Sequence, residues 1–347
     1  MSDLRLAGDV RVALSHMAAI GLAAILEDAG ASDVGVGWAG GLDPQPIVTA
    51  RGIDWSEAAD RVKVHAQRHA AESDWTAATI DDGVTRTGLM SPRIKPRNTE
   101  AGWLELASHR REVIDDQVTR RRWLDLHMIG ALGEPAYWRF NAQRQRLPDD
   151  GASRWEMKTR NGGKEFVQHR LHPLARRVAD RSLEGIRDGL VGVSVRDEAG
   201  SDDLDSRTGT GLTGPGRVDN AIAWCALWGI SQFPVVPRVM RPSRTAGHLR
   251  PPRSDAIPRY GWFYLPVPIR PIALPRLRSI IVSGHLARAA VPADMTTADA
   301  ALSAEGARTW LINRGIGAVV RFPIGEFGSA NAPERRALLG TVVRLEA

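Results

Sequence analysis

The sequence predicts an α+β protein of two lobes, in which helices pack on small antiparallel sheets. Stretches with helical spacing of apolar residues recur along the chain, and short apolar segments bounded by Gly and Pro stand between them. No long internal repeat is evident, which argues against a solenoid. With 347 residues, 43% of them hydrophobic, the chain can bury a large core and divide into two lobes.

The first lobe is expected to span residues 1–196 and to open as helix, hairpin, helix. Helical spacing over 11–29 ends at Gly30, a residue typical of helix C-caps. Two β segments follow, DVGVGWAG and QPIVTAR, and Asp54 with Glu57 has the spacing of a capping box. A second helical pattern covers 98–133, after an exposed loop, TRTGLMSPRIKPRN, that could track a nucleic-acid strand.

Residues 197–216, DEAGSDDLDSRTGTGLTGPG, are predicted to form a disordered or mobile linker, because they are acidic first and rich in Gly and Thr afterwards. The second lobe, 217–347, then begins with the apolar helix VDNAIAWCALWGISQF, ended by Pro234. An Arg/Pro-rich stretch, the β segment YGWFYLPVPI and a helix from about Pro275 follow. The chain ends as helix, strand, turn, strand.

Charge is segregated along the chain, although the net charge is only +6. Residues 1–85 hold 13 acids and 6 bases, whereas residues 139–181 hold 11 bases and 5 acids. Residues 238–278 carry 9 Arg against the single acid Asp255. Segregated positive charge favours a polyanion as partner, and Arg offers bidentate contacts to phosphate.

The basic segment 153–180, SRWEMKTRNGGKEFVQHRLHPLARRVAD, combines a Gly-Gly turn with cations and rings. Gly162 and Gly163 free backbone amides before a predicted helix N-terminus, which favours anions. The predicted nucleic-acid contacts are Arg154, Lys158, Arg160, Lys164, Arg170, Arg176 and Arg177, with Arg241, Arg244, Arg250 and Arg253 as a second surface. The alternative is a solvated amphipathic helix.

The tryptophans divide into two predicted groups. Some lie among apolar neighbours at helical spacing and are expected in the core, namely Trp103, Trp123, Trp224, Trp228 and Trp310. Others have Arg residues nearby and are candidates for stacking a base, although burial is an equal alternative for them: Trp138, Trp155 and Trp262.

No catalytic residue, cofactor or metal ligand is predicted. Gly209, Gly211 and Gly214 have the spacing G-x-G-x-x-G, but an acidic stretch precedes them where a dinucleotide site needs a buried strand. His65 and His69 are four apart on a predicted helix and could seat a metal with Asp60 or Glu72 nearby, yet a structural or solvated pair is favoured.

The acidic clusters carry the main rival interpretation, a metal-dependent nuclease. Such an enzyme would bind a divalent cation through Asp81 and Asp82, or through Asp202, Asp203 and Asp205. Adjacent acids in loops usually serve solubility, so the chain is predicted not to be an enzyme.

The location is predicted to be cytoplasmic, with no membrane partner. No apolar run approaches the roughly 18 residues that a membrane span needs, and the first thirty residues lack the cationic start and cleavage site of a signal peptide. Cys225 is the only cysteine and lies in an apolar run, so it is expected in the core.

Several segments together resemble proteins encoded in type I-G CRISPR loci, formerly called type I-U. They are SHMAAIGLAAILE, VGVGWAGGLDPQPIV, NGGKEFVQHRLHPLARRVA, AWCALWGISQFPV, PIALPRLRSII and RGIGAVVRFPIGEFG, and the pattern formed by their order extends over most of the chain. The resemblance implies a large-subunit-like protein, or one that accompanies the helicase-nuclease, with a non-enzymatic part in crRNA-guided interference.

The sequence therefore predicts a non-enzymatic nucleic-acid-binding component of a type I CRISPR interference system in antiviral defence. Its expected partners are crRNA or target DNA, contacted through the backbone, together with other effector subunits or the helicase-nuclease. The alternatives are the metal-dependent nuclease and a protein-interaction scaffold without direct nucleic-acid contact.

Overall fold

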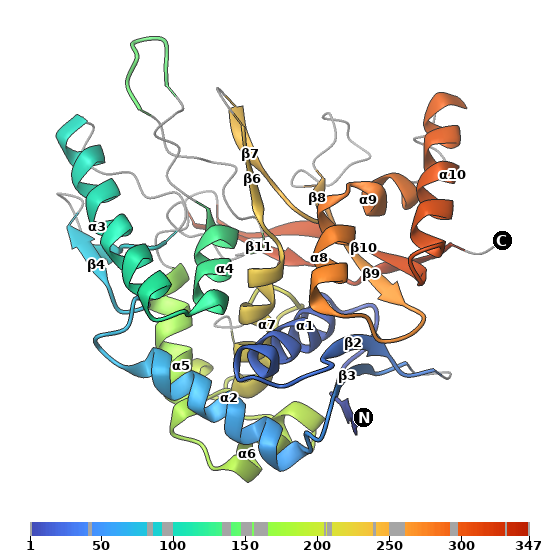
Figure 1. Cartoon of the computed structure of the whole chain (residues 1–347), viewed down its shortest axis with the longest axis horizontal. Helices are drawn as coiled ribbons and strands as arrows, with labels where there is room; N and C mark the ends of the chain where they lie inside the picture. The colour runs from blue at the N-terminus through green and yellow to red at the C-terminus, as the bar shows by residue number, and fades with distance from the viewer. Residues whose placement is uncertain are drawn as a thin grey trace.

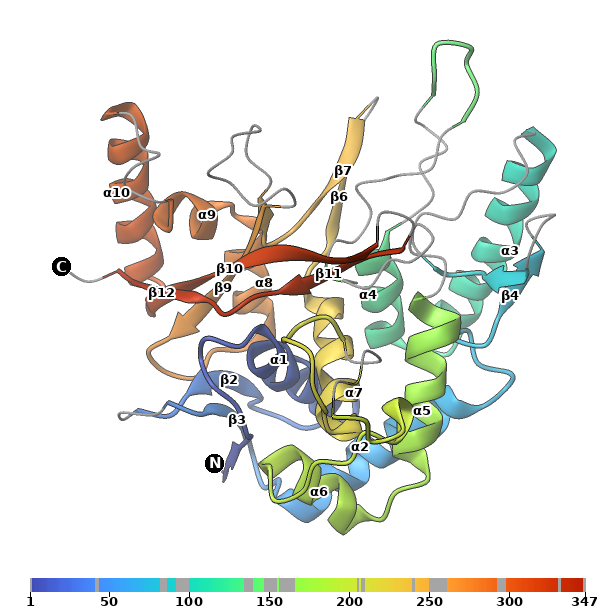
Figure 2. The ribbon, with the colours of Figure 1, turned by 180° about the vertical axis from the view of Figure 1, so that it is seen from behind.

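The computed structural model of the chain is an α+β fold, which confirms the predicted class (Figure 1). Helices surround small antiparallel sheets. The long β10–β11 ribbon lies at the back in Figure 1 and crosses the front of the molecule in the reverse view (Figure 2). The structure describes residues 2–40, 44–81, 86–91, 100–133, 140–146, 155, 166–204, 206, 210–238, 241–249, 261–291, 298–329 and 332–345.

The N-terminal sheet has three antiparallel strands in the order β1-β3-β2: β1 (Ser2–Arg5), β2 (Gly35–Trp38) and β3 (Pro46–Ala50). Leu4 and Val36 both pair with Val48 on the central strand. The predicted hairpin is confirmed, and β1 is an added strand that the sequence pattern did not indicate. Helix α1 (Ala13–Asp28) packs against this sheet and is buried on nearly every side.

Helix α2 (Trp55–Ala70) begins with the predicted capping box, which is confirmed. Glu57 N donates to Asp54 Oδ1 at 2.9 Å, and Asp54 N donates to Glu57 Oε2 at 3.4 Å. The pattern predicted as one helix over 98–133 is divided into α3 (Glu100–Thr119) and α4 (Trp123–Leu132). The break lies at Arg121, whose φ of 55° is left-handed and cannot continue a right-handed helix. The strands β4 (Thr79–Asp81) and β5 (Arg86–Gly88) form a short hairpin between α2 and α3.

The part of the basic segment that the structure describes is helical. One π-helical stretch, η1 (Val167–Leu171), continues directly into α5 (His172–Ala179), whose first turn contains Pro173. Proline has no backbone N–H, so the carbonyl four residues before it loses its α-helical donor. In a π-helical turn that carbonyl can accept from the residue after the proline instead. Helix α6 (Leu183–Val191) and the 3-10 turn η2 (Glu198–Gly200) follow.

The C-terminal half supplies a second helix of the core and the larger sheet. The first elements are α7 (Asn220–Gly229), the 3-10 turn η3 (Ile230–Gln232), β6 (Val235–Arg238), β7 (Arg241–Thr245) and β8 (His248–Leu249). The later ones are β9 (Trp262–Pro268), α8 (Leu274–Val282), α9 (His285–Ala289), α10 (Ala298–Ile312), β10 (Ile316–Ser329), β11 (Ala332–Ala337) and β12 (Thr341–Arg344). The sheet order is β11-β10-β9-β8, with β12 also paired to β10.

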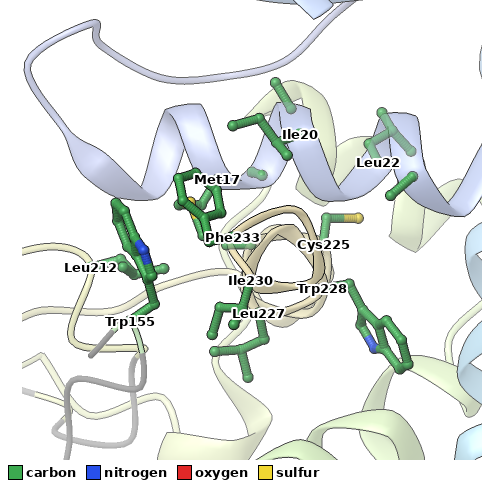
Figure 3. Close-up of a cluster of buried hydrophobic side chains, with 14 of the residues drawn as sticks. Met17, Ile20, Leu22, Trp155, Leu212, Cys225, Leu227, Trp228, Ile230 and Phe233 are labelled. Carbon is green, nitrogen blue, oxygen red and sulfur yellow. The ribbon is translucent and has the colours of Figure 1, made fainter. Parts of the chain in front are cut away.

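Helices α1 and α7 cross at very short range in the centre of the core. Figure 3 shows α7 end-on beneath α1, with Met17 of α1 next to Phe233 and with Trp228 on the side of α7 that faces away from α1. The approach requires glycine on both helices. A Cβ on Gly21 would lie 2.6 Å from Gly229 N, and a Cβ on Gly229 would lie 3.1 Å from Met17 C.

One hydrophobic cluster joins both halves of the chain, so the segment 197–216 does not separate two cores. Leu212 is fully buried, and its carbonyl accepts from Leu14 N at 2.9 Å. The described residues 210–212 of that segment are thus buried, although its composition predicted a disordered or mobile linker. A second link between the halves runs from strand β2, where Val36 and Ile272 exchange two backbone hydrogen bonds of 2.9 Å.

Candidate nucleic-acid interface

Only some of the predicted contacts fall on residues that the structure describes. Arg170 lies in η1, Arg176 and Arg177 lie in α5, and Arg241 and Arg244 lie in β7. Predicted contacts outside the described residues are Arg154, Lys158, Arg160, Lys164, Arg250 and Arg253. The geometry of the basic segment is thus defined at its helical end.

Arg170 and Arg177 line one cavity of about 130 Å³ together with His169. The guanidinium carbon of Arg170 lies 5.5 Å from the centre of the Phe166 ring. Arg177 and His169 are exposed, whereas Arg170 is half-buried and its Nη1 is shielded from solvent. The structure therefore brings together two of the predicted contacts, and a third, Arg176, lies beside them on the same helix.

The rest of the lining is mixed: Thr210, Asn220 and Asp197 are polar, and the other side chains are apolar. Asp197 is 2% exposed, and its Oδ1 accepts from Gly200 N and Asn220 Nδ2, both at 3.0 Å. Its Oδ2 has no hydrogen-bond partner. The cavity thus offers guanidinium donors together with a buried acceptor, a set that suits a phosphate next to a sugar hydroxyl.

Arg176 projects from the same helix and its side chain is 62% exposed. Its nearest acid is Glu72, with Nη1 and Oε1 3.7 Å apart, and the carboxylate of Glu72 is itself 80% exposed. Such a solvated pair contributes little to stability, so it leaves Arg176 available to a phosphate at small cost. Arg244, on the second predicted surface, donates from Nη2 to Val282 O at 3.2 Å.

Of the two alternatives for Trp155 and Trp262, burial is confirmed and base stacking is not, because both rings are buried. Trp155 stacks on Phe263 with ring centres 3.8 Å apart, and its Nε1 donates to Ala246 O at 2.9 Å. It lies among core side chains in Figure 3. Trp155 therefore anchors the basic segment to the core. Trp138 lies outside the described residues.

The prediction of a core position is confirmed for Trp103, Trp224 and Trp228 and is wrong for Trp123, which is 56% exposed. Trp123 follows Arg120–Arg122 at the start of α4. Three consecutive cations before the ring indicate a surface position, and its helical spacing among apolar residues outweighed them in the prediction. Trp310 is half-buried, stacked on His285 and covered by Arg314 at 3.6 Å from its ring centre.

His65 and His69 form a buried pair on the inner face of α2, with Trp228 packed against both rings. His69 Nδ1 lies 2.9 Å from Asp74 Oδ2, and its Nε2 lies 3.3 Å from Asp125 Oδ1. Burial, followed by the neighbouring charges of His69 and Arg68, holds the pKa of His65 well below its usual value. Buried, tightly packed rings of this kind are typical of structural histidines.

The described acids do not assemble a cation site. Asp202 Oδ1 accepts from Asp197 N at 2.8 Å and from Arg217 Nη2 at 2.7 Å. Both hydrogen bonds lower the pKa of Asp202, and the bond from Asp197 N has the larger effect. Asp82 and Asp205 lie outside the described residues. Within the ranges that the structure covers, no group of three or more His, Cys, Asp or Glu side chains is placed to hold a metal ion.

Gly211 and Gly214 are described, and Gly209 is not. No strand precedes these glycines between residues 193 and 206 in the described part of the chain, so the arrangement of a dinucleotide site is missing there. Cys225 is buried, as predicted, and burial raises the pKa of its thiol.

Comparison with known proteins finds no matching protein family, no similar curated protein and no similar solved structure. Among the helices that the structure describes, each is too short or too polar to cross a lipid bilayer.

Proposed function

We propose that this protein is a non-enzymatic nucleic-acid-binding component of a type I CRISPR interference system, which contacts the backbone of crRNA or target DNA. The observation that carries the proposal is the cationic face formed by Arg170, Arg176 and Arg177, two of which line one cavity. The resemblance to proteins of type I-G loci supplies the biological setting. That role would place the protein in the cytoplasm beside other effector subunits or the helicase-nuclease.

The electrostatics of this face favour a polyanion over a single acidic side chain. Its three guanidiniums lie within two turns of one helix, and the acid next to Arg176, Glu72, is solvated. Each phosphate neutralised by such a cation releases condensed counterions, which lowers the slope of log K against log salt by about 0.9 on duplex DNA and about 0.7 on single strands. Three contacts therefore give a measurable salt dependence.

The test is binding of the purified protein to labelled single- and double-stranded DNA and RNA over a salt series, with and without magnesium. The double variant Arg176→Glu/Arg177→Glu should bind more weakly and lose roughly two units of salt slope on duplex DNA. A matched control, Arg5→Glu/Arg344→Glu, changes net charge equally at exposed positions on two strands far from α5. If both variants lost binding affinity equally, net charge alone would explain the effect, and the proposal that this face binds nucleic acid would be refuted.

The two alternatives give different results in the same experiment. Cleavage of the strands in magnesium would establish a nuclease, against which the Arg217–Asp202 pair argues because it occupies one carboxylate of the predicted cluster. Absence of binding to all four nucleic acids at low salt, with retained binding to effector subunits, would establish the scaffold.

A further inference from the structure

A second cavity, of about 240 Å³, lies apart from the cationic face, where the end of α1 meets α4, η3 and α8. We call it the Trp123 pocket. Its lining includes Glu27, Arg121, Trp123, His127, Gln232 and Arg278. Both α4 and α8 contact η3, which contributes Gln232 to the lining. The volume is below the roughly 300–1,000 Å³ of sites that enclose drug-sized ligands, so it suits one ring system rather than a dinucleotide.

The floor of the Trp123 pocket holds a polar atom that the fold leaves without a partner. Gln232 is 2% exposed, and its Nε2 donates to Ser231 Oγ at 2.8 Å. The hydroxyl of Ser231 donates its single proton to Trp228 O at 2.7 Å, so toward Gln232 it can act only as an acceptor. This fixes the amide orientation and leaves Gln232 Oε1, which has no partner, as a buried acceptor.

A buried acceptor without a partner costs about 1–3 kcal/mol, and a ligand that supplies an N–H recovers that cost. The exposed carboxylate of Glu27 adds another acceptor to the same lining. Two acceptors disfavour a base edge that itself presents carbonyl oxygens on both sides of a single N–H. They favour an edge with an exocyclic amino group, such as adenine, guanine or cytosine.

The rim of the Trp123 pocket is suited to stacking and to negative charge. Trp123 is 56% exposed, an unusual position for the largest apolar side chain. Arg121 keeps a left-handed φ of 55°, a conformation that costs a non-glycine residue about 1 kcal/mol or more. The N-terminus of α4 opens here without a side-chain cap, because its N-cap residue Arg122 makes no cap hydrogen bond.

Arg278 and His127 complete the cationic side of the rim. Arg278 Nη1 lies 3.1 Å from His127 Nδ1, and burial followed by the nearby Arg278 charge lowers the pKa of His127. His127 is therefore neutral near pH 7 and can accept a hydrogen bond from Arg278, which keeps its charge. Asp28, the second acid at the pocket, is paired with Arg68 at 3.0 Å and adds less negative charge.

The geometry points to a binding site for one unpaired nucleotide whose base carries an exocyclic amino group. The base stacks on Trp123 with its amino edge toward Gln232, and the phosphate meets Arg121, Arg278 and the N-terminus of α4. The same chemistry is offered by a free mononucleotide and by a base splayed from a single strand. The inference does not depend on the backbone contacts proposed for Arg176 and Arg177.

The experiment is titration calorimetry of the full-length protein with AMP, GMP, CMP and UMP, and with single-stranded and duplex oligonucleotides. Trp123→Ala should weaken binding about 5- to 100-fold, the range that loss of one base–aromatic stack gives. Trp310→Ala is the matched control, because Trp310 is a partly exposed ring on another helix and should leave binding unchanged. Gln232→Leu, nearly the same size, should remove the preference over UMP.

Two results support the site and identify its source. Binding of mononucleotides that is sensitive to Trp123→Ala indicates a free nucleotide, while sensitivity confined to single strands indicates a splayed base. Equal binding of UMP and AMP by the unaltered protein, or Trp123→Ala binding that matches Trp310→Ala for every ligand, would overturn the inference. Arg176→Glu/Arg177→Glu should leave mononucleotide binding unchanged, so failure of the proposed backbone contacts can be told from failure of this pocket.

Discussion

Substitution of Gly21 by Ala should destabilise the whole protein, because the new methyl group has no space between α1 and α7. An ideal Cβ at this position lies 2.6 Å from Gly229 N and 2.7 Å from Cys225 C, whereas ordinary contacts are 3.4–4 Å. The carbonyl oxygen of Cys225 would lie closer still, so the two helices would have to separate by considerably more than about 1 Å. The obstructing atoms are backbone, so no rotamer change relieves the overlap, and the cost should reach or exceed the ~3 kcal/mol upper end of overpacking.

The assay is thermal and urea unfolding followed by circular dichroism. For a chain of this size about 3 kcal/mol lowers Tm by roughly 5 °C or more. Gly130→Ala is the matched control, because Gly130 lies inside α4 and a Cβ there meets nothing within 4 Å. That variant should be neutral or gain up to about 1 kcal/mol. Equal stability of Gly21→Ala and the unaltered protein would refute the reasoning about the helix crossing.

Two further predictions concern buried ionisable groups. Burial lowers the pKa of His16 to about 4, so the unfolded chain takes up a proton below pH 6.5 before the folded one does, and about 3 kcal/mol of stability is lost between pH 6.5 and 4. Urea unfolding across that range should show a shallower slope in His16→Gln, and an unchanged slope would contradict the assignment. Arg181→Ala removes the ion-pair partner of Glu198 and of the 1%-exposed Asp219, both within 2.8 Å of the guanidinium. The free energy of unfolding should fall by about 3–5 kcal/mol, which thermal unfolding would detect as a lower Tm. The exposed Arg187 serves as control, since its loss should cost under about 1 kcal/mol, and similar losses in both would sink the argument.

Local signals in the sequence predict the elements well wherever short-range chemistry decides them. The capping box at Asp54 and Glu57 sets the start of α2, and Pro234 ends the apolar stretch of α7 and η3. The break at Arg121 was not predictable, since a left-handed Arg carries no compositional signal. The strand β1 was missed because a four-residue edge strand has too short a pattern to stand out.

Long-range packing explains where the prediction of the site failed. Trp155 lies between cations in the sequence, which favoured stacking on a base, yet Phe233 and Phe263 from the other half of the chain enclose its ring. Trp123 has the apolar spacing of a core residue but begins α4 at the surface. The segment 197–216 has the composition of a linker. The burial of Leu212 against α1 depends on a long-range contact that this composition does not indicate.

The crossing of α1 and α7 also sets a problem for synthesis on the ribosome. Gly21 meets Cys225, so the almost wholly apolar α1 emerges while its partner helix is still some 200 residues from being made. At elongation rates of about 5–20 residues per second, the wait lasts about 10–40 s. The strands β2 and β3 can cover one side of α1 soon after it is made, but the side that meets α7 stays exposed during that interval, and a chaperone that holds apolar segments would keep it from aggregating.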